Sequence, residues 1–171
     1  SCLFLENLCA HIAEAFNNGY DDHLIFESLN EPRLRGTNFE WTYNKNDSLN
    51  QDAINCLNGF NQLIVNTIRK SGGNNAKRLI LVPGLQASLV SANSTEFKIP
   101  EDPVSENKSK IGLSVHMYSP YNFAMENSEV KVFDNRMATS LQSAFDGLNN
   151  NFCRKGVPVV ITEYGAVNKN N

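Results

Sequence analysis

The chain has 171 residues and a formal net charge of −3, from 15 basic and 18 acidic side chains. Hydrophobic residues make up 41% and charged residues 19% of the sequence, a balance that supports a buried core and argues against a disordered chain. A mildly acidic chain lacks the excess of basic residues with which proteins bind nucleic acid or an anionic membrane. The apolar runs are too short to cross a bilayer. We therefore expect neither nucleic acid nor a membrane as a partner.

Helices and short apolar strands alternate along the chain. Helices are predicted where apolar residues recur at helical spacing, over 3–16, 51–70 and 136–152. Strands are predicted where apolar and β-branched residues run together, over 23–29, 79–83, 111–118 and 157–163. The polar stretch 86–110 is predicted to be an excursion, and Asp134 or Asn135 is the expected cap of the last helix.

This alternating order predicts parallel strands joined by crossover helices, in an open doubly wound sheet or a (β/α)8 barrel. No predicted strand is followed by a Gly-rich phosphate-binding turn, so a nucleotide-binding fold has little support. Four strands cannot close a barrel, and complete barrels have about 250 residues. Because an isolated parallel sheet exposes two edges, we expect residues 1–171 to form a single, incomplete domain that belongs to a larger one.

The cysteines show neither a CxxC motif nor a metal-ligand spacing. They are Cys2, Cys9, Cys56 and Cys153. Most of them lie in or beside predicted helices, where we expect small buried apolar residues. Their even number still permits one disulfide.

Polar side chains gather at the carboxyl ends of three predicted strands. Asn30 and Glu31 end the first strand, His116 and Tyr118 the third, and Glu163 the fourth. The loops at that end of a parallel α/β fold converge on one mouth, so we expect these side chains to lie together. Acid/base cleavage of a glycosidic bond requires at least two carboxylates, and Glu31 and Glu163 come from strands that are far apart in the sequence. Neither the spacing nor the residue types indicate the three convergent ligands of a zinc site, and no metal or cofactor is expected.

Aromatic residues and one further acid lie near the same strand ends. Trp41 and Tyr121 offer flat faces on which a sugar ring can stack, with packing as an equal alternative for each. Glu27 precedes Glu31 on the same side of the first strand. If that side faces a barrel interior, we expect Glu27 to be a buried acid with a structural role.

Three segments together resemble one known family. FESLNEPR (26–33), SVHMYSPYNFA (114–124) and VITEYGAVNKNN (160–171) are similar to the acid/base signature, the sixth strand and the seventh strand of glycoside hydrolase family 5. The resemblance spans the chain from the third helix to just past the seventh strand of a (β/α)8 TIM barrel. The continuations SPYNFA and EYGAV-NKNN look most like endoglucanases and xyloglucanases of rumen and clostridial microbes.

The resemblance implies a retaining endo-β-1,4-glucanase that acts on cellulose or related β-glucans. Glu31 would be the general acid/base and Glu163 the nucleophile of a double displacement. Asn30 would bind the sugar 2-OH, Tyr118 would hold Glu163, and His116 would orient the acid or contact the glucose ring. The chemistry implies no cofactor, and a polymeric substrate implies a secreted enzyme.

The family's first three strands and its eighth, which bring further side chains to the site, have no counterpart in the sequence. Two alternatives therefore stay open. One is a non-catalytic half barrel that binds β-glucan or a complementary chain, and a second chain that completes the barrel is a candidate partner. The other is a mannanase or xylanase of the same clan.

Overall fold

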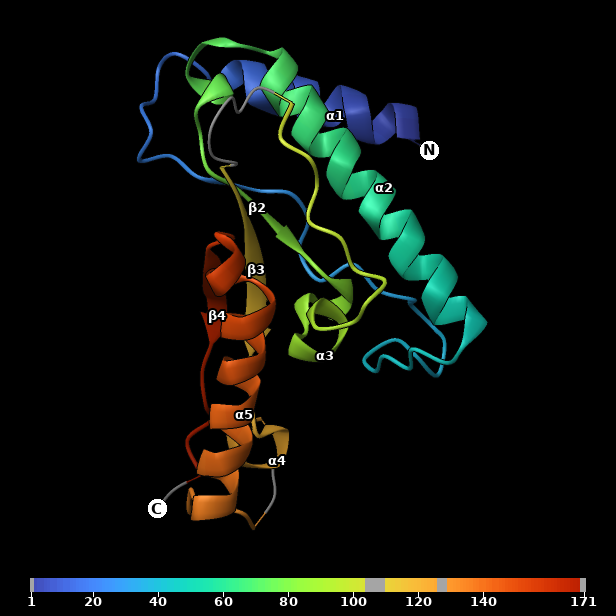
Figure 1. Cartoon of the computed structure of the whole chain (residues 1–171), viewed down its shortest axis with the longest axis vertical. Coiled ribbons are helices and arrows are strands. Elements are labelled where there is room, and N and C mark those ends of the chain that lie inside the picture. The colour runs from blue at the N-terminus through green and yellow to red at the C-terminus, as the bar shows by residue number, and fades with distance from the viewer. Residues whose placement is uncertain (1, 104–109, 126–128, 170–171) are drawn as a thin grey trace.

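The computed structural model describes residues 2–103, 110–125 and 129–169. Its strands form one parallel sheet in the order of the sequence: β1 (Phe26–Glu27), β2 (Ile80–Pro83), β3 (Ile111–Met117) and β4 (Val159–Tyr164). The longer helices are α1 (Cys2–Ala15), α2 (Ser48–Lys70) and α5 (Asn135–Asn151), and α3 (Leu89–Ala92) and α4 (Tyr121–Ala124) are single turns (Figure 1). The predicted parallel arrangement and the order of its elements are confirmed.

A hydrogen bond across the sheet shows that it is curled. The hydroxyl of Thr162 on β4 donates to Oε1 of Glu27 on β1 over 3.2 Å, although these are the two outermost strands. In a flat sheet three strand spacings would hold β1 and β4 about 14 Å apart. The sheet is therefore a half barrel, and Glu27 faces its concave side. Glu27 is exposed rather than buried as expected, because the described residues leave this side open.

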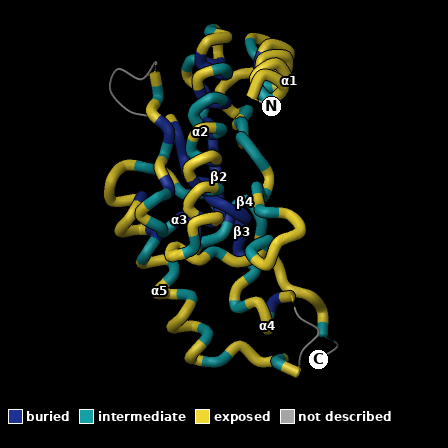
Figure 2. Tube along the Cα trace, turned by 90° about the vertical axis from the view of Figure 1, so that its right-hand side faces the viewer, coloured by how far each residue is buried: buried dark blue, intermediate teal, exposed yellow. Residues whose placement is uncertain are grey.

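The core lies between α2 and the convex side of the sheet. All residues of β2 and β3 are buried, and Figure 2 shows these strands in dark blue beneath α2. Among the largest fully buried side chains are Ile54 and Ile64 of α2, which belong to one cluster with Ile80 and Leu113 of the strands. Burial on both faces is typical of parallel strands. β4, at the edge, is only half-buried.

Aspartate caps set where the helices begin. Asp47 accepts a hydrogen bond from the backbone N of Asn50, so α2 begins at Ser48, three residues before the predicted start. The Oδ1 of Asp134 accepts from the backbone N of Met137 over 2.9 Å, which makes Asp134 the cap of α5. One of the two expected caps is thereby selected.

The first strand is much shorter than predicted. The sequence favoured a strand over 23–29, but only Phe26 and Glu27 pair with β2. The backbone oxygens of Asp21 and Leu24 instead accept hydrogen bonds from the guanidinium of Arg78, a fully buried side chain. Because those carbonyls are used by Arg78, the chain before Phe26 wraps around it and does not extend the sheet.

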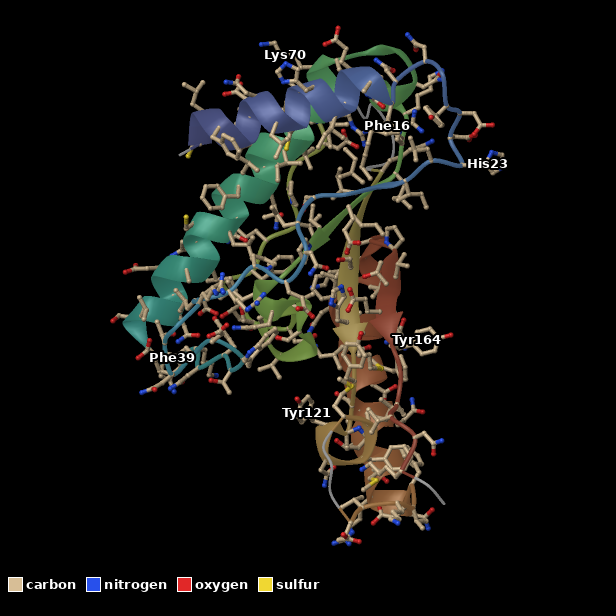
Figure 3. The ribbon with its side chains drawn as sticks, turned by 180° about the vertical axis from the view of Figure 1, so that it is seen from behind. Phe16, His23, Phe39, Lys70, Tyr121 and Tyr164 are labelled. Atoms are coloured by element: carbon tan, nitrogen blue, oxygen red, sulfur yellow. The ribbon has the colours of Figure 1, made fainter. Side chains whose placement is uncertain are left out.

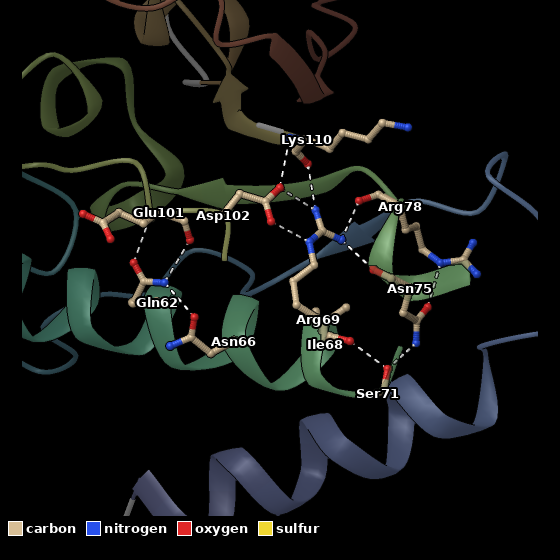
Figure 4. A network of polar contacts seen from close by, with 10 residues as sticks. All are labelled: Gln62, Asn66, Ile68, Arg69, Ser71, Asn75, Arg78, Glu101, Asp102 and Lys110. Carbon is tan, nitrogen blue, oxygen red and sulfur yellow. Dashed lines mark hydrogen bonds and ion pairs between the residues drawn. The ribbon is translucent and has the colours of Figure 1, made fainter. Parts of the chain in front are cut away.

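A buried ion pair fixes the excursion after β2 to α2. Arg69 of α2 donates from Nε and Nη2 to the two oxygens of Asp102 over 2.9 and 3.0 Å, and both side chains are almost fully buried. The Nη1 of Arg69 also donates to the carbonyls of Asn75 and Arg78 (Figure 4). The excursion is therefore an ordered part of the fold over the residues that the structure describes.

The expectation of buried cysteines was wrong for most of them. Cys2, Cys56 and Cys153 are exposed, Cys9 is half-buried, and all four are free thiols. Cys56 lies beside the core residue Leu57 on α2, but on the solvent-facing side of the helix. Helical periodicity decides burial here, and the apolar character of the thiol does not.

Apolar side chains also line the outer face of α1. Leu3, Phe4, Leu8, Ile12 and Phe16 on or next to this helix are 41–69% exposed. An apolar stripe of this size on a helix normally packs against a further element. No helix among the described residues is long and apolar enough to cross a membrane.

Candidate active site

The predicted polar residues meet at the carboxyl end of the half barrel. Glu31 follows β1, while His116 lies in β3 and is paired in register with Glu163 of β4. Tyr118 comes directly after β3. Figure 3 shows Tyr121 and Tyr164 toward this end of β3 and β4, and Phe16 and His23 near the opposite end. The strand register therefore brings together groups that are far apart in the sequence.

Two carboxylates and an imidazole form the centre of the site. Nδ1 of His116 lies 2.8 Å from Oε1 of Glu31 and 3.2 Å from Oε2 of Glu163. One oxygen of Glu31 and one of Glu163 lie within 4.8 Å of each other and of the ring nitrogen. The His116 side chain is 3% exposed, Glu31 19% and Glu163 40%. His116 thus bridges two acids that differ in their access to solvent.

Tyr118 supports the carboxylate of Glu163. Its phenol donates a hydrogen bond to Oε2 of Glu163 over 2.9 Å. This hydrogen bond, together with desolvation and the negative charges of Glu163 and Glu31, raises the pKa of Tyr118. The phenol therefore stays a donor at neutral pH, and Glu163 keeps an oriented carboxylate.

Glu31 is held in an uncommon backbone conformation. Its φ is 34°, a region that non-glycine residues rarely occupy. The backbone N of Gln86 donates over 2.8 Å to the carbonyl of Pro32, directly after Glu31. Strained conformations of this kind cluster at functional sites, where the surrounding structure maintains them. The turn at Glu31 is thus tied to the next loop along the sheet.

The remaining predicted binding residues are open to solvent. Asn30 is exposed beside Glu31. Trp41 is 59% exposed and Tyr121, at the start of α4, is 61% exposed. Neither aromatic residue is buried in the core of the described residues. Each is available to a ligand, and their roles in stacking stay predictions.

Arg33 and Gln86 were not singled out from the sequence. The guanidinium carbon of Arg33 lies 4.3 Å from the ring centroid of Trp41. Gln86 follows β2, is 6% exposed and has a φ of 55°. Arg33 lies two residues after Glu31, within the segment FESLNEPR, and a left-handed glutamine has no local signature in sequence. Both residues contact the loop that carries Trp41.

Three potential metal ligands do converge, which corrects the expectation that the spacing excludes this. They are Glu31, His116 and Glu163. Tetrahedral zinc would hold its ligand atoms roughly 3.3 Å apart, whereas His116 and Glu31 approach to the 2.8 Å of a hydrogen bond. The arrangement is therefore that of two carboxylates on either side of one imidazole, which is hydrogen-bonded to Glu31. Asp21, Asp22 and His23 form a second, fully exposed group beside a surface hollow of about 620 Å³.

The curled parallel sheet and the carboxylate pair at its carboxyl end define a class. It is the (β/α)8 barrel with a two-carboxylate site of the kind found in glycoside hydrolases. The family model "Cellulase (glycosyl hydrolase family 5)" matches residues 3–171. The chain belongs to glycoside hydrolase family 5, as its motifs implied.

Curated relatives agree with this assignment. The chain is 44% identical over 172 residues to Endoglucanase A of Clostridium longisporum, and the match covers 98% of this chain and 31% of that protein. It is 40% identical over 162 residues to Endoglucanase 1 of Ruminococcus albus, with 95% of this chain and 37% of that protein covered. The chain thus spans about a third of the length of these curated relatives.

Solved structures share the fold over the whole chain. A mutant family 5 lichenase from a Caldicellulosiruptor species, in complex with cellotetraose, superposes with a TM-score of 0.92 at 40% identity and covers 100% of this chain and 47% of that one. A GH5-4 broad specificity endoglucanase from Ruminococcus champanellensis with bound cellotriose gives 0.85 at 40% identity, over 98% and 46%. The half barrel is therefore part of a (β/α)8 barrel fold.

Proposed function

We propose that the site belongs to a retaining endo-β-1,4-glucanase, with Glu31 as general acid/base and Glu163 as nucleophile. The observation that carries this proposal is the approach of their carboxylate oxygens to within 4.8 Å. Retaining glycosidases hold their two carboxyl groups about 5–5.5 Å apart, whereas inverting ones need about 6.5–9.5 Å to admit a water molecule. The close spacing favours direct attack by one acid on the sugar.

In the first step, an oxygen of Glu163 attacks C1 of the glucose unit while the bond from C1 to the leaving oxygen breaks. The carboxyl proton of Glu31 passes to that oxygen, and a glycosyl ester of Glu163 results. In the second step, Glu31 takes a proton from water as the water oxygen bonds to C1. The ester bond breaks and the Glu163 carboxylate is restored, so two inversions give net retention.

Three neighbours have supporting roles in this proposal. Tyr118 fixes one oxygen of Glu163 through its 2.9 Å hydrogen bond and so orients the other oxygen for attack. His116 orients the acid, since its Nδ1 lies 2.8 Å from Glu31. Asn30 is exposed next to Glu31, where its amide can bind the sugar 2-OH, an interaction that strengthens in the transition state. The role of Asn30 is what the family resemblance implies, and the roles of Tyr118 and His116 are also supported by their hydrogen bonds.

The substrate class that we propose is β-linked glucan. The relatives are endoglucanases, and the solved neighbours include a lichenase with cellotetraose. The exposed rings of Trp41 and Tyr121 can stack on the apolar faces of glucose units. These names favour glucan over the mannan or xylan of the alternative reading, and a polymeric substrate favours secretion of the enzyme.

The test is release of reducing sugar from barley β-glucan, xyloglucan and carboxymethylcellulose. We expect hydrolysis by the chain to be lost in Glu163→Gln and kept in Glu6→Gln, a matched change at an exposed position of α1. Unchanged activity of Glu163→Gln would overturn the assignment of the nucleophile. The order of the three rates would define the preferred glucan.

A second candidate function is supported by the open edges of the half barrel. β1 and β4 each have one strand neighbour among the described residues, and the outer face of α1 is apolar. These surfaces suit the complementary part of a barrel, and the chain would then bind glucan without cleaving it unless that part is present. Oligosaccharide binding by the chain without hydrolysis, followed by gain of hydrolysis on addition of the complementary strands, would support this reading.

A further inference from the structure

One guanidinium joins the backbone of Glu31 to the ring of Trp41. The Nη1 of Arg33 donates to the carbonyl of Glu31 over 3.2 Å, and its Nε donates to Oε1 of Glu40 over 3.2 Å. Its central carbon lies 4.3 Å from the centroid of Trp41. A planar cation over an aromatic face is attracted by the ring quadrupole. Because Trp41 is nevertheless 59% exposed, Arg33 covers one face and leaves the other to solvent.

Glu40 completes the attachment of this loop. Its Oε2 accepts a 2.9 Å hydrogen bond from the backbone N of Gly36, while Oε1 accepts from Arg33. The side chains of Arg33 and Glu40 are 30% and 27% exposed, so the pair is partly shielded from water. The chain from Glu31 to Trp41 is therefore closed on itself by polar contacts.

Gln86 attaches the same loop to the end of β2. Its backbone N donates to the carbonyl of Pro32 over 2.8 Å. Its side-chain Nε2 lies 3.3 Å from the carbonyl of Phe39 and 3.4 Å from that of Thr42, on either side of Trp41. One residue thus contacts both ends of the loop.

The conformation of Gln86 is unfavourable by itself. Both Gln86 and Ala87 have positive φ, 55° and 50°. The Oε1 of Gln86 is buried and has no hydrogen-bond partner among the residues that the structure describes. The positive φ and the buried, unpaired oxygen both lower the stability of the folded chain. The contacts of the backbone N and Nε2 with the loop depend on this conformation.

We propose that Arg33 and Gln86 are positioning residues that lock the loop from Glu31 to Trp41, so that the acid/base and the indole ring act as one rigid unit on the leaving-group side of the cleaved bond. This inference rests on the proposed function, because a general acid necessarily lies beside the oxygen that it protonates. The ring fixed to the same loop then supports the leaving sugar. Pre-fixed aromatic surfaces bind with less ordering cost than mobile ones.

Fluorescence tests the lock directly, because Trp41 is the only tryptophan of the chain. We expect Arg33→Lys and Gln86→Met to raise iodide quenching of Trp41 by about two- to fivefold and to lower its anisotropy. Arg35→Lys is the matched control, since Arg35 lies in the same loop, is exposed, and keeps in lysine the positive charge that acts on Glu40. Circular dichroism checks that each variant is folded. Quenching and anisotropy equal to wild type in both test variants would overturn the inference, whatever the chain hydrolyses.

Kinetics test the leaving-group assignment. Cellotetraose needs the acid and a bound leaving sugar, whereas dinitrophenyl β-cellobioside has a leaving group that needs neither. We expect Arg33→Lys to lower kcat/KM for cellotetraose roughly tenfold and to leave the aryl substrate within about twofold. An equal loss on both substrates would overturn the assignment to that side. If wild type cleaves neither substrate, the chain has no activity without the complementary strands, and the fluorescence result alone decides whether the loop is locked.

Discussion

The phenol of Tyr118 donates a hydrogen bond to Oε2 of Glu163, the same oxygen that lies 3.2 Å from Nδ1 of His116. A single carboxylate oxygen is thus held from two directions by residues at the end of β3. The other oxygen of Glu163 stays available, in a side chain that is 40% exposed. This division suits a nucleophile, which needs one oxygen fixed and one free to attack.

Removal of the Tyr118 hydroxyl should slow turnover without unfolding the chain. We expect Tyr118→Phe to lower kcat roughly tenfold, because Glu163 loses one of its two positioning contacts. The comparison is with Tyr20→Phe, an exposed tyrosine at the other end of the sheet. Equal kcat values for Tyr118→Phe and wild type would show that the hydrogen bond has no role in turnover.

The same bond predicts a pH dependence of stability. The pKa of Tyr118 is raised in the folded chain, first by its hydrogen bond to Glu163. A raised folded-state pKa gives stability that is present below the unfolded value, about 10, and lost as pH rises through the folded value. Urea midpoints of wild type and Tyr118→Phe should therefore differ at pH 7 and converge in alkali. A difference that grows above pH 10 would contradict this cause.

The ion pair between Arg69 and Asp102 should dominate the stability of the excursion. The side chain of Arg69 is only 1% exposed, and Asp102→Asn leaves its buried charge without the bidentate acceptor. Loss of one partner of a buried pair costs about 3–5 kcal/mol in free energy of unfolding, which urea denaturation measures.

A surface ion pair provides the control for that measurement. Arg136 and Asp134 lie 3.4 Å apart, but the Arg136 side chain is 95% exposed. Arg136→Met should leave the urea midpoint almost unchanged, because exposed pairs contribute little. A comparable loss in both variants would mean that burial is not what makes the Asp102 contact strong.

Glu40 should make the loop around Trp41 sensitive to acid. The backbone N of Gly36, followed by Arg33, holds the pKa of Glu40 below its usual range. A lowered folded-state pKa gives stability that is present above the unfolded value, about 4.3, and lost as pH falls through the folded value. Trp41 quenching should rise as wild type is acidified through this range. In Glu40→Gln it should already be high at pH 7 and change little with acid, and a wild-type-like titration would refute the link.

The apolar face of α1 should cause self-association of the chain. Phe4 and Leu8 are 69% and 46% exposed, so glutamine at both positions removes apolar surface from water at little cost to folding. Light scattering should show fewer oligomers in the double variant at equal concentration. Identical scattering would mean that this face is not what associates.

Sequence reasoning recovered the elements that follow from periodicity and the site that follows from strand ends. It placed Glu31, His116 and Glu163 at one mouth because parallel strands share their direction, and the structure brings these residues together. It overestimated β1, because the capture of the preceding carbonyls by Arg78 is a long-range contact. It missed Gln86 for the same reason, since its conformation is imposed by contacts with the loop after β1.

In the proposed reaction, Glu163 attacks the sugar while Glu31 transfers the proton. The most direct measurement is mass spectrometry of the chain after reaction with dinitrophenyl 2-deoxy-2-fluoro-β-cellobioside, which accumulates a glycosyl ester in a retaining enzyme. We expect one fluorocellobiosyl adduct, located on Glu163 by peptide mapping. An adduct on Glu31, or cleavage of cellotetraose with inversion and without an adduct, would contradict it.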